Sequence, residues 1–299
     1  NETIRYKLVM KNKVSSEYKA KINVKNESES TQTFSDLILL NNPIKKFQTI
    51  PGKEIATTDE GLLTTNDSDG LSYYFRGNVK NNYVKIGDLY FRIIRINGNG
   101  SVRLVLENVL LNKYPYNTNH YNAEVGFTSV SNLSTSTLMV ALNEWYQTNL
   151  SIYNDFISEE NYCIDNKFEN IVGNLHYSNS YTRIYTNNEP SLTCFGETIK
   201  SKVGLISADE VAFAGAVKET SNKEYYLYNE VNTGDYLTLN TYYANETGEL
   251  TMINILEDGS IGSGILTTKE SGIRPVININ QSAKVKGKGT KTNPYIIVG

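Results

Sequence analysis

Residues 89–106 read LYFRIIRINGNGSVRLVL, and this stretch decides the expected architecture of the chain. Residues 89–96 and 101–106 are two strand-like runs on either side of an Asn-Gly-Asn-Gly turn. Asn-Gly supplies the positive φ angles that a two-residue hairpin loop requires. The stretch therefore predicts an antiparallel hairpin.

Further short strands and a few helices are predicted around this hairpin. Leu138, Leu142, Trp145 and Tyr146 recur at helical spacing and predict a helix over 134–150. A capping box at 207–210 opens a second helix, which Gly215 ends. The other strands are expected at 72–76, 83–86, 236–239, 250–256, 273–279 and 295–298. The expected fold class is α+β, with many short strands around two or three helices.

The first 24 residues alternate apolar and polar side chains in two runs, 3–10 and 17–24. Such alternation predicts a β-hairpin, and an isolated hairpin is only marginally stable in water. We therefore expect it to pair with other strands, in its own chain or in a neighbouring copy. The assembly residues would be Ile4, Tyr6, Leu8, Met10, Tyr18, Ile22 and Val24.

Residues 26–33 are polar and are interpreted as a linker or surface loop. A short helix capped by Ser35 is expected to run through Leu40 and to end before Pro43. Residues 48–70, rich in Thr, Asp and Gly, are expected to be irregular. The predicted organisation is an N-terminal β appendage at 1–33, a helix and irregular linker at 34–70, and the main domain at 71–299.

Composition excludes two classes of partner. The 299 residues carry 29 basic and 32 acidic side chains, a net charge of −3. Nucleic-acid-binding proteins usually concentrate basic charge in a patch or stripe, so no nucleic acid partner is expected. No run approaches 18 apolar residues, so no membrane span is expected either.

The two cysteines, Cys163 and Cys194, are either a disulfide or two unrelated buried thiols. Their surroundings are polar and resemble loops, which favours a bridge in an oxidising compartment. Closing a loop of this length would stabilise the chain by roughly 3–4 kcal/mol.

Motifs for metals, cofactors and catalysis fail on inspection. His120 and His176 have no zinc-ligand spacing around them. Residues 65–76 resemble a calcium loop, but Arg76 stands where a bidentate Glu is required. Residues 287–290 lack the full phosphate-loop pattern. We therefore expect no metal, no cofactor and no enzymatic activity.

Tyrosine is abundant, with 22 residues against one tryptophan. Tyrosine offers a large contact area at low entropic cost and a hydroxyl for hydrogen bonding. An alternative is an overall compositional bias together with ordinary strand preference. The predicted ligand-binding set, in which Asp235 would orient a polar group, is Tyr226, Tyr228, Asp235, Tyr236, Tyr242 and Tyr243.

Several segments together resemble a known family. They are DGLSYYFRGNVKNNYV (69–84), FRIIRINGNGSVRL (91–104), VGLISADE (203–210), GIRPVINI (272–279) and NPYIIV (293–298). Over about residues 60–299, the chain resembles an uncharacterised C-type-lectin-like domain family of secreted and surface proteins from low-GC Gram-positive bacteria. The resemblance implies an extracellular or cell-surface location and a ligand surface built from long loops. The calcium-lectin signatures Glu-Pro-Asn and Trp-Asn-Asp are missing, so calcium-dependent sugar binding is not expected.

Two functions follow from these observations. The first is adhesion, or binding of a glycan or host-surface ligand, through the Tyr-rich loops. The second is a structural role as the subunit of an extracellular filament, assembled through the N-terminal strands. In both, Arg92, Arg95, Arg103 and Arg274 are interpreted as strand residues that brace the sheet.

Overall fold

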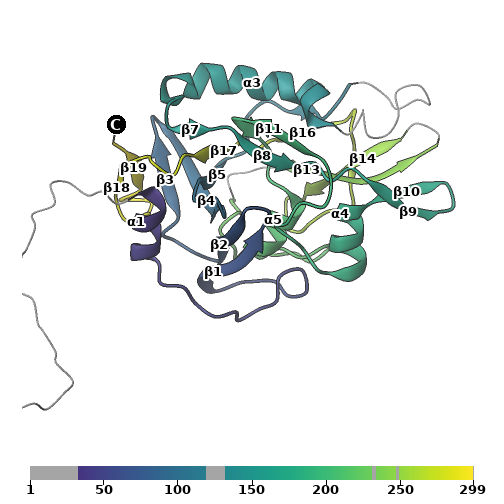
Figure 1. Ribbon diagram of the computed structural model, residues 1–299. Coiled ribbons are helices and arrows are strands. Elements are labelled where there is room, and N and C mark those ends of the chain that lie inside the picture. Colours follow the sequence, from purple (N-terminus) through teal and green to yellow (C-terminus); the bar gives the residue numbers. More distant parts are fainter. Residues whose placement is uncertain (1–32, 119–131, 231–233, 247–248, 299) are drawn as a thin grey trace, which may run out of the picture. The chain divides into compact units, whose positions relative to one another are not determined.

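The computed structural model describes residues 33–118, 132–230, 234–246 and 249–298 (Figure 1). It is a mixed α+β fold, as the sequence predicts. The expected assembly residues lie outside the described residues; they are Ile4, Tyr6, Leu8, Met10, Tyr18, Ile22 and Val24.

The predicted hairpin is confirmed, with β4 (Leu89–Ile96) antiparallel to β5 (Val102–Leu106), and it lies at the centre of the main sheet. Its turn differs from the prediction. The Asn97 amide donates to the Ser101 carbonyl at 2.8 Å, and the Gly100 amide donates to the Asn97 carbonyl at 2.8 Å. Only Gly100 has a positive φ, of 85°. The connection is thus a three-residue loop with glycine in the left-handed region, the next most common hairpin type.

The main sheet of the described chain follows the order β12-β17-β5-β4-β3-β19-β18, with β1, β2 and β7 attached. Most neighbours are antiparallel, but β19 runs parallel to β3. The bounds are β1 (Asp59–Asp67), β2 (Gly70–Gly77), β3 (Tyr83–Ile86), β7 (Ile157–Ser158), β12 (Val203–Gly204), β17 (Val276–Ile279), β18 (Val285–Lys286) and β19 (Tyr295–Ile297).

A second sheet follows the order β15-β14-β13-β10-β9 and extends away from the main sheet in Figure 1. Its strands are β9 (Phe168–Val172), β10 (Leu175–Ser178), β13 (Tyr236–Asn245), β14 (Leu250–Ile255) and β15 (Ile265–Leu266). Two small antiparallel pairs complete the strands: β8 (Glu160–Cys163) with β11 (Thr198–Ser201), and β6 (Tyr114–Pro115) with β16 (Glu270–Ser271).

The two longer predicted helices are confirmed. The helix α3 (Thr137–Leu150) lies over the main sheet and buries Leu138, Leu142 and Tyr146 (Figure 1). The capping box at Ser207 opens α5 (Ala208–Ala214), and Gly215 follows it with φ 134°. The remaining helical segments are α1 (Phe34–Asn41), α4 (Asn179–Tyr181), the 3₁₀ turns η1 (Leu133–Thr135) and η2 (Ser151–Tyr153), and the π-helical η3 (Thr182–Asn187).

The predicted cap of α1 was wrong by two residues. Thr33, not Ser35, caps the helix, because Asp36 completes a capping box with it. The Ser35 hydroxyl instead donates to the Gly100 carbonyl at 2.6 Å. This hydrogen bond joins α1 to the turn of the central hairpin.

The prediction that residues 48–70 are irregular was wrong for residues 59–67. Residues 59–67 form β1, which pairs with β2 over its whole length and buries Leu62 and Leu63. Phe34 packs edge-on against Tyr295 in the same core, with ring centres 5.4 Å apart. The segment lacks strand alternation, so its pairing with β2 and its burial, rather than local preference, make it a strand.

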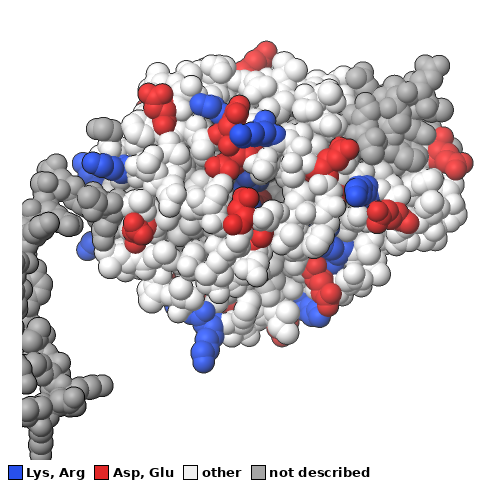
Figure 2. Space-filling model, viewed as in Figure 1, with Lys and Arg blue, Asp and Glu red and all other residues white. Residues whose placement is uncertain are grey.

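Charge is dispersed on the visible face of the molecule. Figure 2 shows basic and acidic side chains interspersed there, without a continuous basic stripe. Among the described residues, no helix is long and apolar enough to cross a membrane.

Candidate functional site

Of the four arginines predicted to brace the sheet, Arg92 and Arg274 each donate more than one hydrogen bond to backbone carbonyls from buried positions. Arg92 Nη2 donates to the Val79 carbonyl at 2.8 Å, and Arg274 Nε donates to the Leu106 carbonyl at 2.9 Å. Burial lowers the pKa of Arg92, although Glu107 partly compensates. The structural interpretation is confirmed for Arg92 and Arg274.

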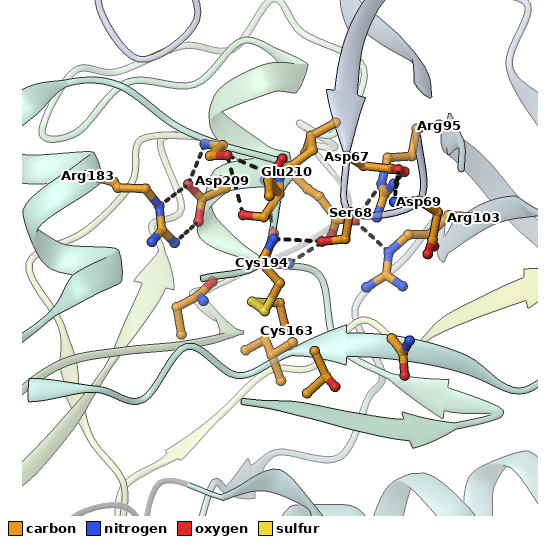
Figure 3. Close-up of a pocket in the computed structure, with 18 residues that line it drawn as sticks. Asp67, Ser68, Asp69, Arg95, Arg103, Cys163, Arg183, Cys194, Asp209 and Glu210 are labelled. Atoms are coloured by element: carbon orange, nitrogen blue, oxygen red, sulfur yellow. Dashed lines mark hydrogen bonds and ion pairs between the residues drawn. A yellow bond between two sulfur atoms is a disulfide. The ribbon is translucent and has the colours of Figure 1, made fainter. Parts of the chain in front are cut away.

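The other two arginines, Arg95 on β4 and Arg103 on β5, line a cavity and meet the carboxylate of Glu210 (Figure 3). Their Nε atoms lie 3.1 Å and 2.6 Å from Glu210 Oε1. The capping box of α5 positions this carboxylate, since Oε2 accepts from the Ser207 amide at 3.0 Å. Arg95 also binds Asp67, at the end of β1.

Electrostatics keep Glu210 ionised despite its burial. Burial alone would raise the pKa of its carboxyl. Arg103, Arg95 and the Ser207 amide outweigh that effect and hold the pKa below its ordinary value. The carboxylate is therefore a fixed negative charge between two arginines.

A second ion network borders the same cavity. Arg183, from η3, donates through Nε to Asp209 Oδ1 at 3.1 Å and through Nη2 to Oδ2 at 2.9 Å. It also pairs with the buried Asp165. The Ser191 amide donates to Asp209 Oδ1 at 2.8 Å, which fixes the loop after η3.

The predicted disulfide between Cys163 and Cys194 is confirmed. Their Cα atoms are 5.6 Å apart and they are separated by 31 residues in the sequence. The bridge ties β8 to the loop over the cavity, and the Cys194 amide also donates to Ser68 Oγ at 2.9 Å. Both cysteines line the cavity (Figure 3).

The predicted ligand-binding residues do not form one surface. Tyr226 and Tyr236 are buried, with 3% and 5% of their surface exposed, so they are removed from a surface site. Their rings face arginines instead: Tyr226 lies 5.3 Å from Arg92, and Tyr236 lies 5.3 Å from Arg274. Both rings belong to the main hydrophobic core.

Asp235 and Tyr228 lie apart from Tyr242 and Tyr243, the other two predicted ligand-binding residues. Asp235 precedes β13 and accepts hydrogen bonds from Asn254 Nδ2 at 3.0 Å and the Glu257 amide at 3.2 Å. Six residues of β13 lie between Asp235 and Tyr242, a distance of roughly 23 Å along an extended strand. Tyr228 packs on the core near Tyr236. Asp235 therefore organises a turn at the far end of the strand.

Tyr242 and Tyr243 belong instead to a cluster of five tyrosines, which we call the tyrosine cluster. Tyr181 and Tyr185 stack with ring centres 5.1 Å apart, and Tyr177 stacks on Tyr181 at 4.1 Å. Tyr242 packs edge-on against Tyr181 at 4.9 Å, and Tyr243 edge-on against Tyr177 at 6.1 Å. Strands β10 and β13 and the segment α4–η3 supply these rings.

Four members of the tyrosine cluster are half-buried and have uncommitted hydroxyls. The hydroxyls of Tyr177, Tyr181, Tyr242 and Tyr243 make no hydrogen bond to any residue that the structure describes. The fifth, Tyr185, is buried and donates to the Gly262 carbonyl. Burial raises the pKa of Tyr242 to about 12, so its phenol is neutral at physiological pH. The cluster presents ring surface together with neutral hydroxyls.

The sequence contains a signal for the cluster that the prediction missed. Tyr177, Tyr181 and Tyr185 recur at four-residue intervals in YSNSYTRIY, the spacing of side chains on one helix face. Ser178 caps the helix that follows Tyr177. Antiparallel pairing of β10 with β13 then places Tyr177 opposite Tyr243.

No group of three or more metal-ligating side chains with suitable geometry occurs in the described ranges. Comparisons of the chain with protein-family models, curated proteins and solved structures found no match.

Proposed function

We propose that this chain is a non-enzymatic extracellular surface protein that binds a glycan through the tyrosine cluster. The proposal rests on the stacked, half-buried rings of the cluster. Four of these tyrosines have hydroxyls that make no hydrogen bond to any described residue. A sugar ring packs its C–H face on an aromatic ring, while its hydroxyls bond to neighbouring polar groups. Tyrosine supplies both kinds of contact from a rigid side chain.

The stacking also reduces the cost of binding. Tyr181 is held between Tyr177 and Tyr185, which both stack on its ring, and Tyr242 packs against it edge-on. Side chains that are already ordered lose little conformational entropy on binding. The cluster is therefore preorganised for a ligand with flat apolar faces and several hydroxyls.

The disulfide supports the extracellular part of the proposal. Disulfides form and persist in oxidising settings and are rare in the cytosol. The C-type-lectin-like resemblance over residues 60–299 points to the same compartment. The near balance of charge favours a neutral or weakly charged ligand over nucleic acid.

A glycan array tests the proposal. The full chain should bind a subset of glycans, and the Y181A/Y243A variant should lose those signals by about tenfold or more. The matched control is Tyr90→Ala, since Tyr90 is a half-exposed tyrosine on β4 that lies outside the cluster. Circular dichroism would verify that both variants fold. Equal binding by the wild type and a folded Y181A/Y243A variant would refute the proposal.

A further inference from the structure

The cavity in Figure 3, of about 80 Å³, is separate from the tyrosine cluster in its lining residues. It lies between the β1–β2 turn, strands β4, β5 and β8, and helix α5. Ser68, Asp69 and Asn161 among its lining residues are exposed, so the cavity opens to solvent. Its floor carries the buried side chains of Arg103, Asp67 and Glu210.

The acceptors nearest the two arginines are already occupied. Asp67 Oδ1 accepts from the amides of Asp69 and Gly70, at 2.8 Å and 3.1 Å. Asp67 Oδ2 accepts from the Gly98 amide at 2.9 Å and from Arg95. Glu210 is likewise shared between both arginines and the Ser207 amide. These carboxylates therefore offer little to a cationic ligand.

The donors, in contrast, are incompletely used. Arg103 is 3% exposed in its side chain, and its Nε lies beside Glu210. Its Nη2 reaches only the Leu205 carbonyl at 3.5 Å, and its Nη1 has no partner among the described residues. Arg95 donates through Nε to Glu210 and through Nη1 to Asp67, whereas its Nη2 has no hydrogen-bond partner among the described residues. A guanidinium has five N–H donors, so each arginine retains donors for a ligand.

The geometry of Arg103 is fixed. Its guanidinium lies over the ring of the buried Tyr162, 4.3 Å from the ring centre. Figure 3 shows its terminal nitrogens directed away from Asp67. A guanidinium held in one plane presents its N–H groups in a fork that matches the two oxygens of a carboxylate.

We propose that this cavity binds a carboxylate group through the free N–H donors of Arg95 and Arg103. Three arginines and four carboxylates line the cavity, so its net charge does not attract an anion, and the selectivity comes from directed hydrogen bonds. A doubly charged phosphate would be repelled by those carboxylates and by Asp69 at the mouth. A planar monoanion is repelled less than a dianion, and its size suits the cavity.

Side-chain NMR of arginine Nε–H groups tests the proposal on the intact protein. Acetate is the probe, and acetamide is its neutral control of similar shape. Acetate should shift the Arg95 and Arg103 signals in a saturable manner, whereas acetamide should not. Arg92 and Arg274, whose donors reach backbone carbonyls, are the internal controls. Equal shifts from the two probes, or shifts that are linear and equal at all four arginines, would overturn the proposal.

A second set of titrations identifies the source of the carboxylate. Glucuronate is compared with glucose, and glycylglycine with its C-terminal amide. Saturable shifts with glucuronate alone would assign a sugar acid, and with glycylglycine alone a peptide terminus. If glucose bound as tightly as glucuronate, and the peptide amide as tightly as glycylglycine, the proposal would be contradicted.

The variant Arg103→Lys removes the fork but keeps the charge. It should weaken acetate binding by about tenfold, because the paired hydrogen bonds are replaced by a single ammonium contact. If this variant does not fold, the comparison of acetate with acetamide on the wild type decides the question alone. Unchanged acetate affinity in a folded Arg103→Lys protein would count against the proposal.

Discussion

The rings of Tyr181 and Tyr185 are stacked 9° from parallel, although one residue is half-buried and the other is buried. Tyr185 fixes the far side of Tyr181 and anchors itself through its hydroxyl to the Gly262 carbonyl. Tyr177 stacks on Tyr181 in turn, so the three rings form one rigid stack that starts from a buried anchor. This relationship is why a ring in the cluster can be proposed as a binding platform rather than as a mobile side chain.

Removing only a cluster hydroxyl separates binding from stability. In Tyr243→Phe the ring remains, and the lost hydroxyl has no partner among the described residues. We expect the free energy of unfolding to change by less than about 0.5 kcal/mol. Binding of the glycan found on the array should weaken several-fold. Urea denaturation and calorimetric titration measure the two quantities, and unchanged affinity would exclude this hydroxyl from the site.

Reduction of the disulfide should destabilise the chain by about 3–4 kcal/mol, from the entropy of a loop of 31 residues. Denaturation with and without reductant measures this difference. A Cys163→Ser/Cys194→Ser variant should match the reduced protein and should not respond to reductant. Two alkylatable thiols in the unreduced, denatured wild type would contradict the bridge itself.

The buried pair of Arg76 and Glu60 should show strong coupling. Both side chains are fully buried, and Arg76 Nε lies 3.3 Å from Glu60 Oε2. Arg76→Met leaves the Glu60 carboxylate buried without its cation, so we expect a loss of about 3–5 kcal/mol. The R76M/E60Q double variant should recover part of this loss. Strict additivity of the two single changes would argue against the pair.

The exposed pair of Lys45 and Asp59 provides the matched control. Their charged atoms lie 3.6 Å apart, and the two side chains are 42% and 52% exposed. Lys45→Met should change the free energy of unfolding by less than about 1 kcal/mol, because solvent screens such pairs. Denaturant titrations of all the variants under one set of conditions measure both cases.

Glu210 predicts a specific dependence of stability on pH. Its pKa is lower in the folded than in the unfolded chain, so its contribution is present above the ordinary value of 4.5. That contribution is lost as pH falls below 4.5 and through the folded pKa. The difference in unfolding free energy between wild type and Glu210→Gln should therefore shrink as pH falls from 7 to 3. A difference that stays constant over this range would contradict the assignment.

Local signals in the sequence predicted much of the fold. The Asn-Gly turn located the central hairpin, and the Ser207 capping box located α5. The strand at 59–67 was missed because its residues carry no alternation and become a strand by pairing with β2. Ser35 was misassigned because Thr33, just before it, makes a capping box with Asp36.

The candidate site was less predictable than the fold. A high local density of tyrosine does not distinguish the buried Tyr226 and Tyr236 from the half-buried Tyr242 and Tyr243. Tyr226 and Tyr236 are buried because their rings pack against Arg92 and Arg274, a contact that only the folded chain brings about. The partners of Tyr242 come from about 60 residues earlier in the chain, so only the pairing of β10 with β13 brings them together.

NMR of the protein labelled with ¹³C in its tyrosine rings shows whether the tyrosine cluster is the glycan-binding surface. On addition of the glycan found on the array, the ring signals of Tyr177, Tyr181, Tyr242 and Tyr243 should shift together and saturate. The signals of Tyr73 and Tyr90, on strands β2 and β4, should stay in place. A glycan that binds the protein yet leaves all four cluster signals unchanged would contradict the account.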